Sequence, residues 1–158
     1  MNKARTREEL RAQLVCKGYR LTQSRETILA LLRSTTSHPD ANWIYDQVRK
    51  KLPHISLGTI YRTLNVLVEA GCIGELHFGN GQARYDGNVS EHYHVVCTEC
   101  GALGDVFVTL PADLESAASE HTDYQITSHH LEFRGLCREC RQRKKESAGL
   151  GKNSNPVS

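Results

Sequence analysis

Residues 56–71 read Ser-Leu-Gly-Thr-Ile-Tyr-Arg-Thr-Leu-Asn-Val-Leu-Val-Glu-Ala-Gly, a stretch that predicts an amphipathic helix beginning at Ser56 and stopping at Gly71. One face carries an apolar stripe, formed by Ile60, Leu64, Leu67 and Val68. At about 100° per residue, Arg62 points almost directly away from that stripe. A short helix with an exposed arginine can enter the major groove of DNA. An ordinary amphipathic helix with a solvated outer face has the same pattern.

The outer side of this helix supplies the candidate DNA contacts. Arg62 can read a guanine or hold a phosphate, and Tyr61 can donate a hydrogen bond to a phosphate. Asn65 shares the outer face with Arg62, and Thr59 lies on its flank. We therefore expect Thr59, Tyr61, Arg62 and Asn65 to face the nucleic acid.

A β-hairpin follows this helix directly. Residues 73–78 and 83–85 have the pattern of two strands, and Gly79-Asn80-Gly81 has the composition of a tight turn. A hairpin beside a recognition helix forms a wing, which adds contacts to the DNA backbone. Arg84 is a candidate wing contact, although it can equally be an ordinary exposed strand residue.

Three further helices are expected before residue 56, because apolar residues recur there at helical spacing. Their apolar positions are Leu10 and Leu14, then Ile28, Leu29, Leu31 and Leu32, then Ile44, Val48 and Leu52. Thr22 and Asp40 are suited to cap the second and third helices at their N-termini. Together with the recognition helix and the hairpin, they predict a winged helix-turn-helix domain over residues 1–85.

The second half of the chain has a different pattern, which predicts an α+β class for the whole protein. Residues 86–90 read as a hinge, and residues 91–145 as a small α/β dimerisation domain. Its expected elements are strands at 92–96 and 104–108, a helix at about 111–120 and a strand at 126–133. Residues 146–158 have the composition of a disordered tail.

Length allows one ordinary domain or two small ones, and composition favours an intracellular protein. The 158 residues carry a formal charge of +2, and basic residues gather in the first twenty positions and between Arg138 and Lys145. No signal peptide is expected, and no stretch has the ~20 apolar residues of a membrane helix. We therefore expect a cytoplasmic protein with reduced cysteines, whose small cores need a metal or a partner subunit.

Four cysteines give the strongest local signal. Cys97 and Cys100 form one Cys-x-x-Cys pair, and Cys137 and Cys140 form another, a pattern that predicts a tetrahedral zinc site. With no open coordination position such a site is structural, and it contributes on the order of 10–16 kcal/mol to folding. A redox pair or two disulfides are the competing interpretations. Cys16 and Cys72 are expected to be small buried residues.

A second metal site is suggested by His92 and His94, which project from the same face of a strand. Asp86 in the hinge and Asp105 on the next strand are the nearest carboxylates with a reason to converge on them. Imidazole and carboxylate without thiolate suit Fe(II), Mn(II) or Zn(II). Two exposed strand histidines would show the same spacing.

Over nearly its whole length the sequence resembles the ferric uptake regulator (Fur) family. The resemblance rests on "SLGTIYRTLNVLVEAG" at 56–71, "HYHVVCTECG" at 92–101 and "SHHLEFRGLCREC" at 128–140. It implies a homodimeric repressor with a winged-helix domain, a structural zinc in the second domain and a regulatory metal where the domains join. The implied partner is double-stranded DNA with a palindromic operator, without a membrane or a small-molecule substrate.

The family also implies a role for each candidate ligand. The structural zinc ligands are Cys97, Cys100, Cys137 and Cys140, and the regulatory Fe(II) or Mn(II) ligands are His38, Asp86, His92, His94 and Asp105. Two aspartates with three histidines are most similar to the peroxide-responsive (PerR-like) branch, whereas iron sensors typically place glutamates at both aspartate positions. A further site of some members has an acidic residue where Tyr93 stands, and His129 matches another of its ligands.

Within that branch, the resemblance implies that Fe(II) and peroxide oxidise His38 or His92, which would release the metal and lift repression. The alternative is a regulator that senses iron, manganese or zinc sufficiency without redox chemistry. Two alternatives belong to other functional classes. An enzyme would show turnover of a small substrate. A protein-interaction module stabilised by zinc would show no salt-dependent affinity for duplex DNA. We expect no enzyme, because no nucleophile or general base stands beside the candidate site.

Overall fold

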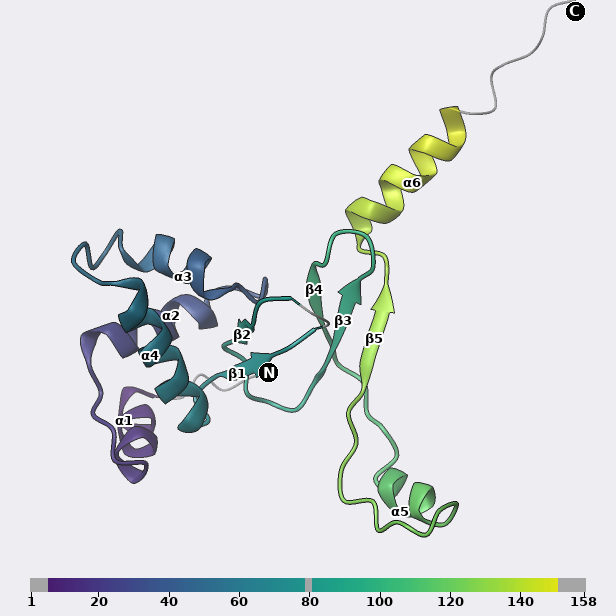
Figure 1. Ribbon diagram of the computed structural model, residues 1–158, viewed down its shortest axis with the longest axis horizontal. Helices are drawn as coiled ribbons and strands as arrows, with labels where there is room; N and C mark the ends of the chain where they lie inside the picture. The colour runs from purple at the N-terminus through teal and green to yellow at the C-terminus, as the bar shows by residue number, and fades with distance from the viewer. Residues whose placement is uncertain (1–5, 79–80, 151–158) are drawn as a thin grey trace, which may run out of the picture. The chain divides into compact units, whose positions relative to one another are not determined.

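The computed structural model describes residues 6–78 and 81–150 (Figure 1). The chain divides into two compact units, with the boundary between Glu91 and His92. That boundary falls one residue beyond the expected hinge of residues 86–90.

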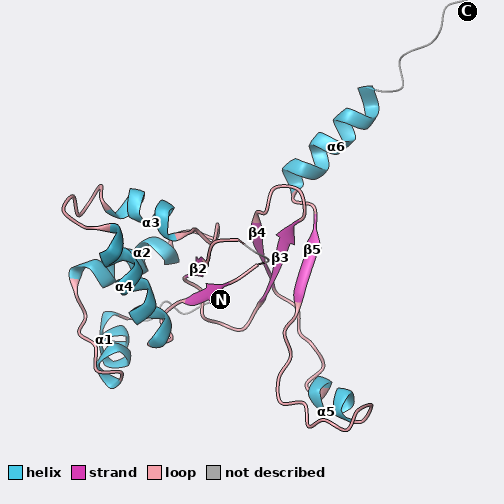
Figure 2. Ribbon diagram, in the orientation of Figure 1, coloured by secondary structure: helices cyan, strands magenta, loops and turns pink. Residues whose placement is uncertain are grey.

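Within its described residues the first unit contains helices followed by a two-stranded hairpin (Figure 2). These elements are α1 (Arg7–Cys16), α2 (Gln23–Arg33), α3 (Ala41–Val48), α4 (Leu57–Glu69), β1 (Gly74–Leu76) and β2 (Arg84–Asp86). The strands pair antiparallel, with Glu75 opposite Tyr85. β1 is shorter than the strand expected at 73–78, and β2 is shifted by one residue from the strand expected at 83–85. Residues 79 and 80 of the expected turn lie outside the described part of the chain. The winged helix-turn-helix order is confirmed.

Side-chain oxygens at the N-caps fix where the helices begin. Thr22, Asp40 and Ser56 each accept a hydrogen bond from the backbone N–H three residues later, which satisfies a donor that the helix leaves unpaired. The predicted caps of α2 and α3 and the predicted start of α4 are therefore confirmed. Gly71 follows the C-cap of α4 with a φ of +65°, as expected for the glycine that ends a helix.

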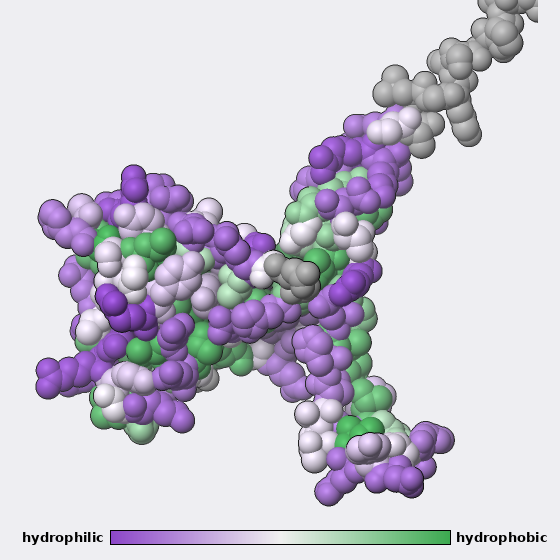
Figure 3. Space-filling view, in the orientation of Figure 1, coloured by the Kyte–Doolittle hydropathy of each residue, from purple (hydrophilic) through white to green (hydrophobic). Residues whose placement is uncertain are grey.

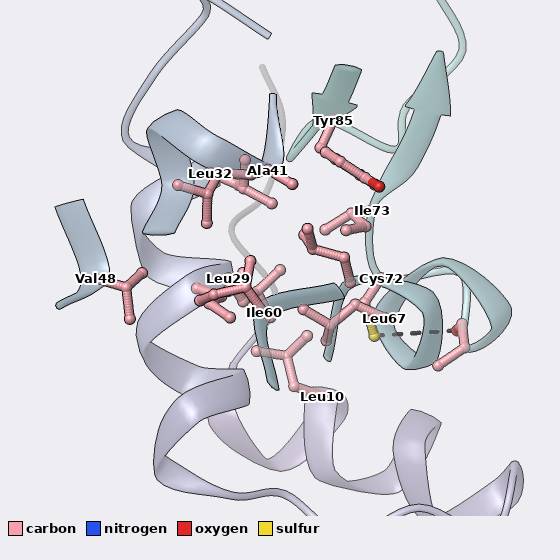
Figure 4. Close-up of a cluster of buried hydrophobic side chains, with 14 of the residues drawn as sticks. Leu10, Leu29, Leu32, Ala41, Val48, Ile60, Leu67, Cys72, Ile73 and Tyr85 are labelled. Atoms are coloured by element: carbon pink, nitrogen blue, oxygen red, sulfur yellow. Dashed lines mark hydrogen bonds between the residues drawn. The ribbon is translucent and has the colours of Figure 1, made fainter. Parts of the chain in front are cut away.

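The core of the first unit lies between the helices and the hairpin (Figure 4). Leu29, Ile60 and Leu67 meet at its centre, and Tyr85 contributes from β2. Each fully buried leucine or isoleucine contributes about 1.5–3 kcal/mol of transfer free energy. The apolar stripe of α4 is thereby anchored, so its opposite face points outward in a fixed direction.

The two cysteines outside the Cys-x-x-Cys pairs differ from each other. Cys72 is fully buried as expected, but Cys16 is exposed, so that prediction was wrong. Cys16 is two residues beyond Leu14 on α1, and about 200° of rotation places it away from the buried stripe.

The second unit contains a three-stranded sheet in the order β4-β3-β5. Its elements are β3 (Tyr93–Cys97), β4 (Leu103–Val106), α5 (Leu114–Ser119), β5 (Glu132–Gly135) and α6 (Arg138–Leu150). β3 pairs antiparallel with β4 and parallel with β5. The α+β class is confirmed.

Two expectations for the second unit were wrong. The strand expected at 126–133 begins only at Glu132, because β3 offers pairing from His94 onward and the preceding residues attach to α5, where the N–H of Ile126 donates to Ser119. Residues 146–150, expected in a tail, instead continue α6. Residues 141–145 are all Arg, Gln or Lys, which favour helix, and residues 141–147 are exposed, so helix propensity and not burial extends α6 past Cys140. Hydrophilic residues cover much of this helix (Figure 3), and the remaining expected tail, 151–158, lies outside the described residues.

Within the described residues, no helix is long and apolar enough to cross a membrane.

Candidate metal centres and the candidate DNA-binding helix

The four paired cysteines converge in the second unit. Cys97 ends β3, Cys100 lies in the following turn, and Cys137 and Cys140 stand at the start of α6. Their sulfur atoms all lie within 4.8 Å of one another. The Cys100 and Cys137 sulfurs are 3.7 Å apart, which matches the roughly 3.8 Å edge of a zinc tetrahedron with Zn–S bonds of about 2.3 Å. That separation is far longer than a disulfide bond of about 2.05 Å. These residues fit a zinc ion.

Hydrogen bonds to sulfur prepare the cluster for an ion. The backbone N–H of Cys137 donates to Cys97 Sγ at 3.3 Å, and the N–H of Cys140 donates to Cys137 Sγ at 3.5 Å. Donors from Cys137 and Cys100 lower the pKa of Cys97 to about 6. At Cys137 the N–H of Cys140 lowers the pKa, but Glu139, burial and the neighbouring thiols outweigh it and raise the pKa to about 12. Crowded thiols resist ionising together, and a divalent cation removes that resistance.

Helix α6 reaches back to this cluster through two side chains. Arg143 Nη2 donates to Cys140 Sγ at 2.8 Å, and Lys144 Nζ lies 2.6 Å from Oε1 of Glu99, which lies between Cys97 and Cys100. Spacing between cysteines does not reveal these contacts. The signal that sequence analysis missed is the i, i+3 relation of Arg143 to Cys140, which puts both on one side of a helix.

A pair of candidate ligands lies in the first unit. His38 stands in the loop between α2 and α3, and Asp86 ends β2. Both are buried, at 2% and 6% exposure, and His38 Nε2 lies 3.7 Å from Asp86 Oδ2. Two donors at that separation can bind one ion, because ligands about 2.1 Å from a metal lie roughly 3 Å from each other.

Strand β2 holds the His38 loop through Arg84. Its guanidinium Nε donates to the carbonyl of His38, and Nη2 donates to the carbonyl of Ser37 at 3.0 Å. The expectation that this side chain is a wing contact or an ordinary exposed strand residue overlooked those carbonyls, which are 46 and 47 residues away in the sequence. Only tertiary structure brings them together.

The second unit contributes a cluster of three candidate ligands. His94 on β3 lies opposite Asp105 on β4 in the sheet register. Asp105 Oδ1 lies 3.6 Å from His92 Nε2 and 4.0 Å from His94 Nε2. The two histidine side chains are 4% and 14% exposed, which contradicts the alternative of two exposed strand histidines. Two imidazoles beside one carboxylate suit Fe(II), Mn(II) or Zn(II).

His129 has two partners outside these clusters. Its Nδ1 lies 2.8 Å from Glu115 Oε1, and its Nε2 lies 3.5 Å from the Tyr93 hydroxyl. The hydrogen bond from His129 lowers the pKa of Glu115. This arrangement links α5 to β3.

The outer face of α4 is accessible in the first unit. Tyr61, Arg62 and Asn65 are exposed, and Thr59 is half-buried. Arg62 Nη2 lies 3.3 Å from Thr59 Oγ1, which in turn lies 2.9 Å from the Ser56 hydroxyl. This chain of polar contacts orients Arg62 at the start of the helix, the part that enters a major groove in helix-turn-helix proteins.

Comparisons with known proteins identify relatives of this chain. The family model described as "Ferric uptake regulator family" matches residues 16–134. The "Peroxide-responsive repressor PerR" of Staphylococcus epidermidis is 38% identical over 135 residues, which cover 85% of this chain and 90% of that protein. The Campylobacter jejuni peroxide stress regulator structure is similar with a TM-score of 0.61 at 26% identity, covering 86% of this chain and all of that one. The Helicobacter pylori ferric uptake regulator shares the fold, with a TM-score of 0.69 at 24% identity over 89% and 97% of the two chains.

Proposed function

The chain belongs to the ferric uptake regulator family of transcription regulators, and we propose that it is a peroxide-responsive repressor whose DNA binding depends on Fe(II) or Mn(II). The observation that carries this proposal is the aspartate and histidine chemistry of the two buried clusters, His38 with Asp86 and Asp105 with its two histidines. Oxygen and nitrogen donors of this kind suit Fe(II) and Mn(II). Relatives named for peroxide response are 37–38% identical to this chain.

The four-cysteine cluster would hold a structural zinc ion. Four thiolates leave no open position, so zinc there supplies folding free energy and no redox chemistry. The second unit depends on that contribution, because its buried hydrophobic residues within the described part of the chain are Cys97 and Cys140 themselves.

The proposed regulatory site takes its ligands from both units. His38 and Asp86 come from the first unit, and His92, His94 and Asp105 come from the second. An ion shared in this way restricts how the units can be oriented. In a homodimer, that orientation sets the spacing of two α4 helices, which has to match half-sites about one helical turn, or a multiple, apart. Ion binding and operator binding are then coupled, and each favours the other.

The proposed DNA contacts are Arg62, Tyr61, Asn65 and Thr59 on α4, and the proposed partner is a palindromic duplex in the cytoplasm. A second copy of the chain would cover exposed apolar side chains of the second unit, among them Phe107 at 72% and Tyr124 at 79% exposure. Exposed apolar surface that gathers in one patch marks a protein interface, and Phe107 is followed directly by Val108 at 45% exposure. The proposed role is binding, without turnover of a substrate.

The proposed signal is oxidation of a ligand histidine. Fe(II) held by the proposed ligands would supply one-electron reducing chemistry toward peroxide, which Mn(II) would not readily supply. In the net reaction, one carbon of the His38 or His92 ring gains one oxygen atom and hydrogen peroxide is reduced to one water molecule. The altered ring is a poorer ligand, so the two units lose their shared constraint and the operator is released.

The decisive experiment compares operator binding by anaerobic protein loaded with Fe(II) or with Mn(II), before and after low peroxide. We expect only the Fe(II) form to lose binding, with a mass gain of one oxygen on a peptide containing His38 or His92. H38A should lose metal-dependent operator binding, and H54A, at an exposed histidine outside both clusters, is its matched control. Unchanged binding in both metal forms would instead identify a metal-sufficiency regulator, and absence of metal-dependent operator binding would refute both.

A further inference from the structure

The loop that carries His38 has an unfavourable backbone conformation. His38 has a φ of +48°, and among the described residues it is the one non-glycine residue with positive φ. The left-handed region is disfavoured for residues with a Cβ. Pro39 follows, and a residue before proline prefers an extended conformation. Surrounding contacts must therefore hold His38 in place.

Those contacts come from β2. Three consecutive carbonyls accept hydrogen bonds from this strand. Arg84 donates from Nη2 to the carbonyl of Ser37 and from Nε to the carbonyl of His38. The backbone N–H of Tyr85 donates to the carbonyl of Pro39 at 2.9 Å. Asp40, next in the chain, forms a β-bridge with Arg84. The whole turn is thus attached to one short strand.

The same strand carries the other candidate ligand of this unit. Arg84 and Asp86 are two residues apart, so their side chains project from the same face of β2. The backbone that leaves β2 is packed tightly as well, since a Cβ on Gly87 would lie 2.6 Å from the carbonyl carbon of Leu32. β2 therefore sets the position of Asp86 directly and that of His38 through the guanidinium.

We propose that Arg84 is a positioning residue of the regulatory metal site, and that it holds His38 beside Asp86 before an ion binds. This inference rests on the proposed function. A guanidinium presents two parallel donors in a fixed plane, which suits two successive carbonyls, whereas a lysine ammonium is a single point donor. Without Arg84 the turn can relax toward the extended conformation, and the ion would have to restore the strained one. Preorganisation lost in this way appears as weaker ion binding.

The first test uses metal-depleted protein that retains zinc. R84Q removes both the charge and the paired N–H donors of the guanidinium, whereas R84K keeps only the charge. The matched control is R49Q, at the C-cap of α3, which removes an exposed ion pair with Asp46. Hydrogen exchange at the Tyr85 amide reports the contact between β2 and Pro39. We expect exchange there to rise at least about tenfold in R84Q, less in R84K and not in R49Q, because local opening becomes easier. Unchanged exchange in R84Q would overturn the proposal.

The second test measures Co(II) binding to the same proteins through its visible absorption, with zinc content and melting temperature checked. We expect the dissociation constant to rise by roughly ten- to a hundredfold in R84Q, the range for residues that orient ligands, with partial rescue in R84K. If wild type binds no ion besides zinc, the proposed function fails. If wild type and R84Q bind Co(II) equally, the function stands and the positioning role fails.

The remaining possibility is a direct DNA contact. In that case R84Q would bind Co(II) as wild type does. The slope of the logarithm of the DNA association constant against the logarithm of salt concentration would become shallower by about one, the effect of losing one phosphate contact. That result would overturn the positioning role and restore the interpretation of Arg84 as a wing contact.

Discussion

Single residues in this protein owe their roles to neighbours at very different distances along the chain. Cys97 and Cys100 are three positions apart, and His92 and His94 are two, so spacing alone predicted that each pair points one way. His38 is 48 positions before Asp86, and no local pattern joins them. The family resemblance supplied that pairing, and the 3.7 Å separation agrees with it. The guanidinium contacts of Arg84 were missed for the same reason. Neither residue spacing nor the family resemblance indicates which distant carbonyls an arginine contacts in the folded chain.

Gly87 offers a test of packing beside the candidate ligand Asp86. An added Cβ would lie 2.6–2.8 Å from the backbone of Leu32 and Arg33, so G87A must displace the end of β2. We expect a loss of about 1–3 kcal/mol in the free energy of unfolding, measured by denaturant titration. G58A is the control, since nothing lies within 3.8 Å of its Cβ and α4 gains helix propensity. Equal stability of G87A and wild type would contradict the close approach.

Tyr85 gives a prediction for alkaline pH. Burial, followed by the charge of Glu75, raises its pKa to about 12 from an ordinary value of 10. Because the folded-state pKa is the higher one, the neutral phenol stabilises the fold fully below pH 10, and that stabilisation is lost as pH rises through 12. The free energy of unfolding should fall by at most about 3 kcal/mol across this window, as two pKa units allow. In Y85F that part of the decline should be absent from urea titrations, and an unchanged decline would assign it to other groups.

At the level of elements, the helices of the first unit were predictable and the strands of the second were less so. Helix starts depend on one capping side chain and a local apolar period, which a sequence displays directly. The extent of β5 depends on where β3 begins, and β3 is nearly forty residues earlier in the chain. The pairing of β5 with β3 starts at Glu132, so residues 126–131 lie outside the strand, and Ile126 bonds to α5 instead. The error at α6 was in the other direction: composition indicated a tail from residue 146, but the helix continues to Leu150.

Helix α6 should slow the release of zinc. Arg143 donates to Cys140 Sγ and offsets part of the negative charge of four thiolates. We expect R143A to release zinc roughly ten times faster to a chromogenic chelator, a usual effect of losing a hydrogen bond to a ligand. K145A, on an exposed part of the same helix, should match wild type. Equal rates for both variants would mean that the sulfur contact does not stabilise the ion.

For the whole molecule, the two units differ in how they obtain stability. All buried hydrophobic residues of the described chain other than Cys97 and Cys140 lie in the first unit. The first unit therefore has an apolar core of its own, whereas the second would rely on its proposed zinc site and on the proposed partner subunit over exposed residues such as Phe107. Length and composition had indicated small domains that need such support. They could not indicate which half needs it, because that depends on which apolar residues become buried.

This asymmetry predicts that removal of zinc acts on one unit. C97S, or a strong chelator under reducing conditions, should unfold the second unit and dissociate the dimer while α1–α4 stay folded, since zinc binding energy is the folding energy of its site. Nuclear magnetic resonance should show the Leu29 and Ile60 methyl signals unchanged while those of Val95 and Val96 collapse, and sedimentation should report monomers. C72S, at a cysteine buried in the first unit, is the control that should retain zinc and the dimer. Cooperative loss of both sets of methyl signals in C97S would show instead that the two units stabilise each other and fold as one.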